Sequence, residues 1–241
     1  MDELSGKTVV VLGGSSGIGL EAARQARIAG AELIITGRNP AHLEEACDEL
    51  AARTAVLDLG DAAGLRRFFT EELPEQVDHV LVMGGGPVYA PIVELDFDQA
   101  RDVLDERLLG SLRVARECAT RVRASGSLTF MTGTHARRPG PGLSIAAIAA
   151  AAVPVITANA AVELAPVRVN AIAAGFVDTP MSARYLGEGL EKRRRQLRET
   201  LPIRRVVGPE DVAALALHLM RNTALTGATY DVDGGQQLIP G

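Results

Sequence analysis

Gly13-Gly14-Ser15-Ser16-Gly17-Ile18-Gly19 joins an apolar run at residues 8–12 to a helical pattern at residues 20–28. Glycines permit backbone angles that other residues resist, and they let a phosphate approach the main chain closely. The helix that follows would present free N–H groups to such a phosphate. A strand, a glycine-rich turn and a helix in this order predict a dinucleotide site on the turn, with a plain tight turn as the alternative.

The rest of the chain alternates apolar runs with helical patterns. Strands are expected at residues 8–12, 32–36, 54–57, 79–83, 127–131, 168–172 and 228–232. Helices are expected between them, for example at residues 20–28, 40–52 and 209–220, where apolar residues recur at three- and four-residue spacing. This order predicts one α/β domain over residues 1–241. We expect a Rossmann-type, doubly wound parallel sheet with helices on both faces and a ligand beyond the carboxyl ends of its strands.

Composition narrows the classes of function. A chain of 241 residues with 47% hydrophobic residues can bury a large core, and its net charge of −5 argues against a nucleic-acid surface. The basic run at residues 192–195 is expected to be a solvated helix face. The N-terminus is acidic where a secretion signal is basic, and no apolar run is expected to approach the roughly 20 residues of a membrane span. These features predict a cytoplasmic protein that binds no membrane.

The two cysteines, Cys47 and Cys118, both fall in expected helices. They form no metal-like cluster, so we expect buried, reduced thiols and no metal site.

The glycine spacing G-x-x-x-G-x-G resembles that of the short-chain dehydrogenase/reductase family. Further stretches resemble the family's landmarks in the same order, over essentially the whole chain: Asp58, residues 83–86 (Met-Gly-Gly-Gly), residues 164–170, residues 174–179, Gly227 and residues 232–235. The resemblance implies that an adenine lies near Asp58 and that residues 174–179 form the loop on the nicotinamide side. The cofactor contacts that it implies are Gly13, Ser15, Ser16, Gly17, Ile18, Gly19, Asp58, Leu59, Gly84, Gly85, Gly175, Val177 and Thr179.

The end of the second expected strand favours NADP(H) over NAD(H). An NAD site would place an acid there on the ribose hydroxyls, but this chain has Thr36-Gly37-Arg38-Asn39. Arg38 can pair with a 2′-phosphate and lay its guanidinium on adenine, and Asn39 beside it is a further candidate contact. The alternative is that Arg38 is a surface arginine in a loop.

The catalytic positions of the resemblance are occupied by other residues. Ordinary family members use serine, tyrosine and lysine, with an asparagine supporting the lysine. Here the tyrosine and lysine positions fall on Ala146 and Ala150, the serine position on Gly133 and the asparagine position on Arg107. None of the tyrosines, at residues 89, 185 and 230, is followed four residues later by lysine. The chain is identified as an atypical member of the family.

His135, in the loop after the fifth expected strand, is the candidate proton donor, because histidine titrates near neutral pH without help from a lysine. A loop histidine bonded to the backbone is the alternative. Arg107 or Arg138 is a candidate to bind an anionic substrate or to polarise a carbonyl oxygen. Salt bridges to carboxylates such as Asp105 or Asp178 would explain these arginines, and above all Arg137, without a role in binding.

These features predict an NADPH-dependent reductase of a small carbonyl or imine-like substrate. A pseudoenzyme that binds NADP(H) and acts on a partner, or a cofactor-assisted non-redox enzyme, remains an alternative. Residues 180–202 are expected to form a mobile substrate lid, with Met181, Tyr185 and Leu186 as apolar pocket residues. The family's habit of pairing subunits through its fourth and fifth helices implies a homodimer or homotetramer.

Overall fold

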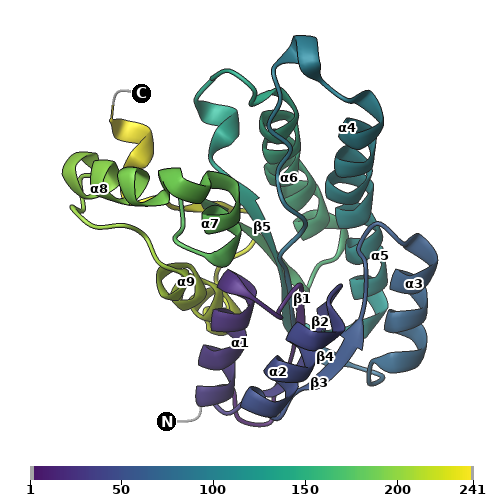
Figure 1. Cartoon of the computed structure of the whole chain (residues 1–241). Coiled ribbons are helices and arrows are strands. Elements are labelled where there is room, and N and C mark those ends of the chain that lie inside the picture. Colours follow the sequence, from purple (N-terminus) through teal and green to yellow (C-terminus); the bar gives the residue numbers. More distant parts are fainter. Residues whose placement is uncertain (1–2, 240–241) are drawn as a thin grey trace.

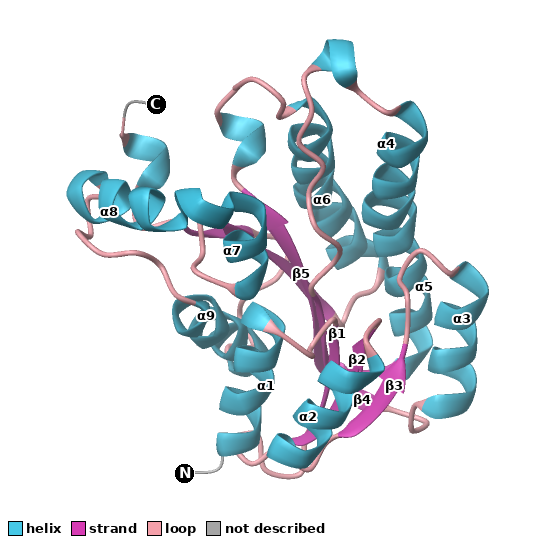
Figure 2. Cartoon of the chain, in the orientation of Figure 1, coloured by secondary structure: helices cyan, strands magenta, loops and turns pink. Residues whose placement is uncertain are grey.

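Seven strands form one parallel sheet in the computed structural model, which describes residues 3–239 (Figures 1 and 2). The strand order is β3-β2-β1-β4-β5-β6-β7. Their bounds are β1 (Thr8–Leu12), β2 (Glu32–Gly37), β3 (Arg53–Val56), β4 (Val77–Val82), β5 (Val122–Gly133), β6 (Arg168–Ala174) and β7 (Thr229–Val232). The chain winds outward from β1 to β3 and then crosses to the other side of β1 at β4. This reversal confirms the predicted doubly wound sheet and opens a crevice beyond β1 and β4.

Helices cover both faces of the sheet. On one face lie α1 (Gly17–Ile28), α2 (Pro40–Leu50) and α9 (Pro209–Arg221), and on the other lie α3 (Ala62–Arg67), α5 (Ser111–Arg121) and α6 (Ser144–Glu163). Successive residues of a strand point to opposite faces, so Val9 and Val11 join the first hydrophobic core while Val10 and Leu12 join the second. Burial on both faces explains the unbroken apolar run of β1.

Two connections at the carboxyl end of the sheet differ from simple loops. A π-helical turn, η3 (Asp105–Gly110), joins α4 (Phe97–Leu104) to α5. The expected lid at residues 180–202 folds as α7 (Pro180–Leu186), a short turn and α8 (Leu190–Thr200), on the side of the sheet toward which β5 points (Figure 1).

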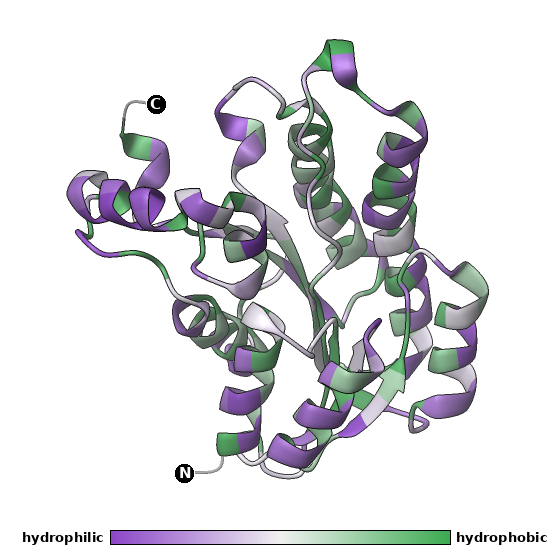
Figure 3. Ribbon diagram, in the orientation of Figure 1, coloured by the Kyte–Doolittle hydropathy of each residue, from purple (hydrophilic) through white to green (hydrophobic). Residues whose placement is uncertain are grey.

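The length of α6 corrects one expectation. It is the helix within residues 3–239 that is long and apolar enough to cross a membrane, by length and composition alone. The expectation that no apolar run approaches that length is therefore wrong. Val153 and Ala160 on this helix pack into the core beneath it, as is typical of the core helix of an α/β domain. Figure 3 shows α6 as largely hydrophobic and α8 as largely hydrophilic.

The two free cysteines lie in helices, as expected. Cys118 in α5 is buried, and burial raises the pKa of its thiol. Cys47 in α2 is only half-buried, so the expectation of a buried thiol is wrong there. Within residues 3–239, no three histidine, cysteine or acidic side chains come together as a metal site would require.

Candidate active site

A cleft of about 610 Å³ opens beyond the carboxyl ends of the central strands. One half, which we call the cofactor half, is lined by the glycine-rich turn, Arg38 and Asp58. The other, the substrate half, is lined by Tyr89 and His135 and by the lid helices α7 and α8. The cleft lies where the strand order reverses, which is where open parallel sheets bind ligands.

The glycine-rich turn is held by its backbone. Gly13 and Gly17 have φ angles of +87° and +55°, which favour glycine. A Cβ at Gly19 would overlap the carbonyl oxygen of Gly13 and lie 3.0 Å from the Cα of Gly14. Because α1 begins at Gly17, the free N–H groups of its first turn lie at the cleft. The turn is therefore shaped to receive a phosphate.

The structure brings together nearly all the predicted cofactor residues. Those that line the cleft are Gly13, Ser15, Ser16, Ile18, Gly19, Arg38, Asp58, Leu59, Gly84, Gly85, Gly175, Val177 and Thr179. Gly17 shapes the turn without lining the cleft. Asn39 also lies outside it, because its side chain accepts a hydrogen bond from the N–H of Ala41 at 3.0 Å and caps α2. The structure therefore assigns Asn39 to the helix cap.

Three consecutive glycines after β4 make room for side chains from other elements. A Cβ at Gly84 would lie 2.9 Å from the guanidinium carbon of Arg107, and one at Gly85 would lie 2.6 Å from Glu106 Oε1. A Cβ at Gly86 would lie 2.6 Å from the hydroxyl of Tyr185.

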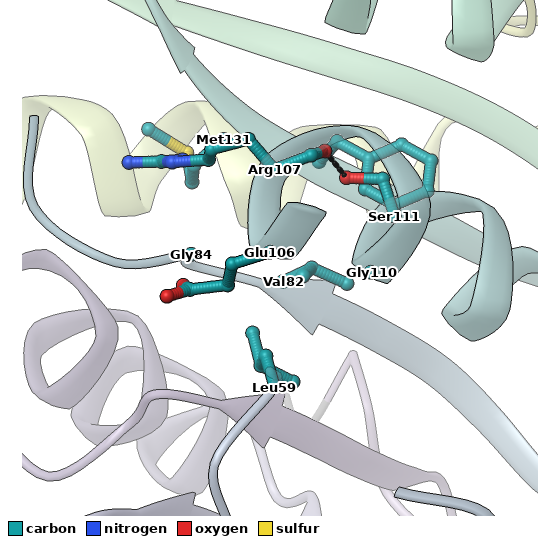
Figure 4. Close-up of a pocket in the computed structure, with 9 residues that line it drawn as sticks. Leu59, Val82, Gly84, Glu106, Arg107, Gly110, Ser111 and Met131 are labelled. Carbon is teal, nitrogen blue, oxygen red and sulfur yellow. Dashed lines mark hydrogen bonds between the residues drawn. The ribbon is translucent and has the colours of Figure 1, made fainter. Parts of the chain in front are cut away.

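The π-helical turn η3 supplies two of those side chains. Arg107 donates to the carbonyl of Gly85, and the carboxylate of Glu106 accepts from the N–H of Gly85 at 2.5 Å. Figure 4 shows the two side chains extending from one turn with the backbone at Gly84 between them, and Ser111 donating to the carbonyl of Arg107 at 2.6 Å. Burial lowers the pKa of Arg107, but a guanidinium stays protonated in proteins. Arg107 is thus a fixed cation in the lining of the cleft.

His135 and Tyr89 form the polar pair of the substrate half. The hydroxyl of Tyr89 lies 2.9 Å from Nε2 of His135, and the ring of Tyr185 packs edge-on against Tyr89 with centroids 5.7 Å apart. Burial, and then the charge of Arg107, lower the pKa of His135. Burial raises the pKa of Tyr89. At neutral pH the pair is therefore an uncharged imidazole bonded to an uncharged phenol.

Tyr89 was not predicted from the sequence, because it lacks a lysine four residues later. The available signal was its place just after the glycine run that follows β4. Residues there lie at the carboxyl edge of the sheet, where the chain following β5 also arrives with His135.

The missing side chain at Gly133 makes room for the imidazole of His135. A Cβ at residue 133 would lie 2.8 Å from Cε1 of His135 and closer still to Nδ1. The ring therefore occupies the space into which a serine side chain would extend. Ala146 and Ala150 are buried on α6 and present methyl groups to the cleft where the resemblance places tyrosine and lysine.

The arginines after His135 are tied to the C-terminal segment. Arg138 lines the cleft, donates to the carbonyl of Gln236 at 2.7 Å and also donates to the carbonyl of Ile239. Arg137 forms an ion pair with Asp231. A salt bridge was the expected alternative for Arg137, but with other partners. Asp105 instead pairs with Arg113 at 2.8 Å, and Asp178 pairs with Arg194 at 2.7 Å.

The lid begins at a capping box. The Thr179 hydroxyl accepts from the N–H of Ser182 at 3.3 Å, while the Ser182 hydroxyl accepts from the N–H of Thr179 at 2.9 Å. Met181, Tyr185 and Leu186 all line the cleft, as expected. The basic run of α8 is not wholly a solvated face, because Arg193 turns into the cleft. That expectation is wrong for this residue.

Comparison with known proteins gives a consistent result. A family profile described as enoyl-(acyl carrier protein) reductase matches residues 13–237. The chain is 29% identical over 255 residues to the short-chain dehydrogenase/reductase malC of Malbranchea aurantiaca, covering 98% of this chain and 97% of the relative.

Two solved structures have the same fold. One is that of the MalC reductase/Diels-Alderase from Malbranchea aurantiaca, with a TM-score of 0.91, 28% identity and 98% of each chain covered. The other is a small-chain dehydrogenase in complex with NADPH, with a TM-score of 0.83 and 27% identity over 96% of this chain and 99% of that one.

Proposed function

The chain belongs to the short-chain dehydrogenase/reductase family, and on that premise we propose that it is an NADP(H)-dependent reductase with an unusual proton donor. Its substrate is a small carbonyl or imine-like compound. The observation that carries the proposal is the hydrogen bond between Tyr89 and His135 in the substrate half of the cleft.

The cofactor half fits NADP(H). The glycine-rich turn and the start of α1 would hold the pyrophosphate, and Asp58 would lie near the adenine. Arg38 follows β2 at the cleft, and no carboxylate within residues 3–239 forms an ion pair with it, so its charge is available to a 2′-phosphate. The NADPH complex of a structural relative supports this choice. When bound, the cofactor would supply the hydride.

The chain's own residues would supply the proton. Because burial keeps Tyr89 protonated, its hydroxyl can donate to Nε2 of His135, which leaves the ring's own proton on Nδ1. Nδ1 is the ring atom nearest to the place of a side chain at residue 133. It is therefore positioned to donate to the substrate's oxygen or nitrogen, in the role that the resemblance gives to the family's tyrosine.

The proton balance closes through Tyr89. As Nδ1 gives its proton to the substrate, Nε2 takes the proton of the Tyr89 hydroxyl. Solvent then supplies a proton to Nδ1, and Nε2 returns its proton to the phenolate, which restores the starting state. The charge of Arg107 lowers the pKa of Tyr89, against the larger effect of burial, so Arg107 would stabilise the phenolate while it lasts. In this scheme the positive charge of Arg107 stabilises the Tyr89 phenolate, and His135 and Tyr89 transfer the proton.

The test is the loss of NADPH absorbance across a panel of carbonyl and imine compounds. With an active substrate, His135→Ala should lower turnover by about 10² to 10⁴, the usual worth of general acid–base help. Tyr89→Phe should lower it less, because the imidazole keeps one ring proton to donate, although nothing then holds that proton on Nδ1. Tyr230→Phe removes a hydroxyl from β7, outside the cleft, and should leave turnover unchanged. Full turnover in His135→Ala would refute the proton-transfer scheme.

Two observations favour other candidates. Methyl groups at Ala146 and Ala150 favour a pseudoenzyme that binds NADP(H) and acts on a partner. The name of the MalC reductase/Diels-Alderase favours a cofactor-assisted non-redox reaction. NADP(H) binding without any turnover in the panel would support the first. Conversion of a compound with no change in NADPH would support the second.

The cellular location and the assembly of the protein are also proposed. We propose a cytoplasmic homodimer or homotetramer that binds neither nucleic acid nor membrane. Exposed apolar side chains on neighbouring helices support the assembly: Phe97 on α4, Leu112 on α5, and Ile148 and Val155 on α6. Sedimentation of the purified protein would measure the number of subunits.

A further inference from the structure

Arg193 is the arginine of α8 that turns into the cleft. It is half-buried, and its guanidinium lies over the ring of Phe176, with the guanidinium carbon 5.9 Å from the ring centroid. One of its nitrogens, Nη1, donates to Oε1 of Gln196 at 2.9 Å. The rest of the guanidinium is left to donate elsewhere.

The charge of Arg193 is not balanced in the way that its neighbour's is. Arg194 pairs with both Asp178 and Glu191. In the part of the chain that the structure describes, residues 3–239, no carboxylate forms an ion pair with Arg193. Burial, and then the charge of Arg138, lower the pKa of Arg193. A half-buried cation beside a like charge is unfavourable until an anion joins it.

The surroundings of Arg193 are positive as a whole. Apart from Arg38 and Asp58 in the cofactor half, the charged residues that line the cleft are four arginines and one glutamate: Arg107, Arg138, Arg184, Arg193 and Glu106. Arg138 donates to backbone carbonyls, which leaves its charge uncompensated, and the carboxylate of Glu106 is bonded to the N–H of Gly85. The chain as a whole carries a net charge of −5. The positive lining is therefore local to this end of the cleft.

Apolar side chains also line this part of the cleft. Phe176, Met181, Leu186 and Leu143 line it together with Arg193. An aromatic ring beneath a guanidinium leaves the planar edge of the guanidinium free, and that edge matches the two oxygens of a carboxylate. The site thus combines one guanidinium with apolar lining side chains.

We propose that the lid end of the cleft is a carboxylate subsite in which Arg193, with Arg138 behind it, binds the carboxylate of a substrate with an apolar body. The apolar body rests on Phe176 and Leu186, and the carbonyl or imine group reaches His135. The substrate class is thus an apolar oxo or imino acid. The reacting group rests on the proposed reductase function, whereas the carboxylate subsite does not.

The subsite can be tested by binding alone. The NADP⁺-loaded protein would be titrated calorimetrically with 3-phenylpropionate and with its neutral analogue 3-phenylpropionamide. A charge-assisted hydrogen bond should make the carboxylate bind at least about tenfold more tightly than the amide. Arg193→Gln should remove that difference, and Arg193→Lys should keep part of it. Arg195→Gln, the same charge change at an exposed position of α8 outside the cleft, should leave it intact.

Two results would overturn the subsite. One is equal binding of the carboxylate and the amide, or no binding of either. The other is a fall in NADP⁺ affinity in Arg193→Gln with unchanged carboxylate binding, which would assign Arg193 to the cofactor's phosphates. The binding test measures no turnover. The carboxylate subsite would therefore remain supported even if the protein proved not to be a reductase.

Discussion

The two halves of the cleft are built differently. The cofactor half depends on the backbone of one short turn, where Gly13 and Gly17 adopt positive φ angles and a Cβ at Gly19 would collide with the chain. The substrate half depends on side chains that arrive from distant segments, as when Tyr89 meets His135 across 46 positions of sequence. A change in one half should therefore leave the other in place, and the comparison can be tested by substitutions confined to one half.

The largest expected effect is on turnover in Gly133→Ser. A serine here restores the family's residue, but its Cβ would collide with the His135 ring, whose Cε1 lies 2.8 Å from that place. Displacing the ring breaks its bond to Tyr89, so turnover should fall by at least about 10². NADP⁺ affinity should not change, because the cofactor half is untouched.

The control for that substitution is Gly189→Ser in the lid. Gly189 has a φ of −75° and open space where a Cβ would lie, so serine fits there without strain. A rise in turnover in Gly133→Ser would show that the serine position can be refilled without cost to His135. That outcome would contradict the scheme in which the imidazole has taken over the serine's place.

The next largest effect is on the free energy of unfolding, and it concerns a histidine in the sheet rather than in the cleft. His79 lies buried between β4 and β5, with Nδ1 2.9 Å from the hydroxyl of Ser127. Burial lowers the pKa of His79 from 6.5 to about 4, so the folded state keeps it neutral while the unfolded chain takes up a proton below pH 6.5. Its contribution to stability is complete above pH 6.5 and is lost as the pH falls toward 4. The loss should reach about 3 kcal/mol.

Chemical denaturation between pH 7 and pH 4 would measure this loss, with His79→Asn as the comparison. Asparagine keeps a polar group toward Ser127 but does not titrate. The difference in unfolding free energy between the two proteins should therefore change steadily over that interval. A pH-independent difference would show that His79 is already able to take up a proton in the folded state.

The smallest effect concerns the choice of cofactor. Arg38→Ser removes the cation from the end of β2, which should weaken NADP⁺ binding by about tenfold and leave NAD⁺ binding nearly unchanged. Fluorescence titration with both cofactors would measure it. Arg66→Ser, at an exposed position of α3, is the matched control. Equal affinities of the unsubstituted protein for NADP⁺ and NAD⁺ would contradict the assigned role of Arg38.

The fold and the cofactor NADP(H) could be predicted from the sequence because their signals are local. The glycine spacing, the apolar runs and Arg38 can each be recognised in a short window. Asn39, which was expected beside the cofactor, caps α2, because the helix end competes for its side chain.

The substrate half depends on contacts that no short window contains. Arg138 bonds to carbonyls at Gln236 and Ile239, about a hundred residues away, and Arg193 on α8 meets Phe176 in the loop after β6. A basic run gives no sign of which of its members faces inward. His135 could be proposed from its place after β5, but its partner Tyr89 could not.

The glycines at residues 84–86 set a condition for transferring this site to another chain. The guanidinium of Arg107, the carboxylate of Glu106 and the hydroxyl of Tyr185 each fill the space of one missing Cβ. An alanine at any of these residues would therefore displace the end of the side chain that now fills its space. A relative that received Arg107, Glu106 and Tyr185 would need glycine at all three matching positions to hold them in the same places.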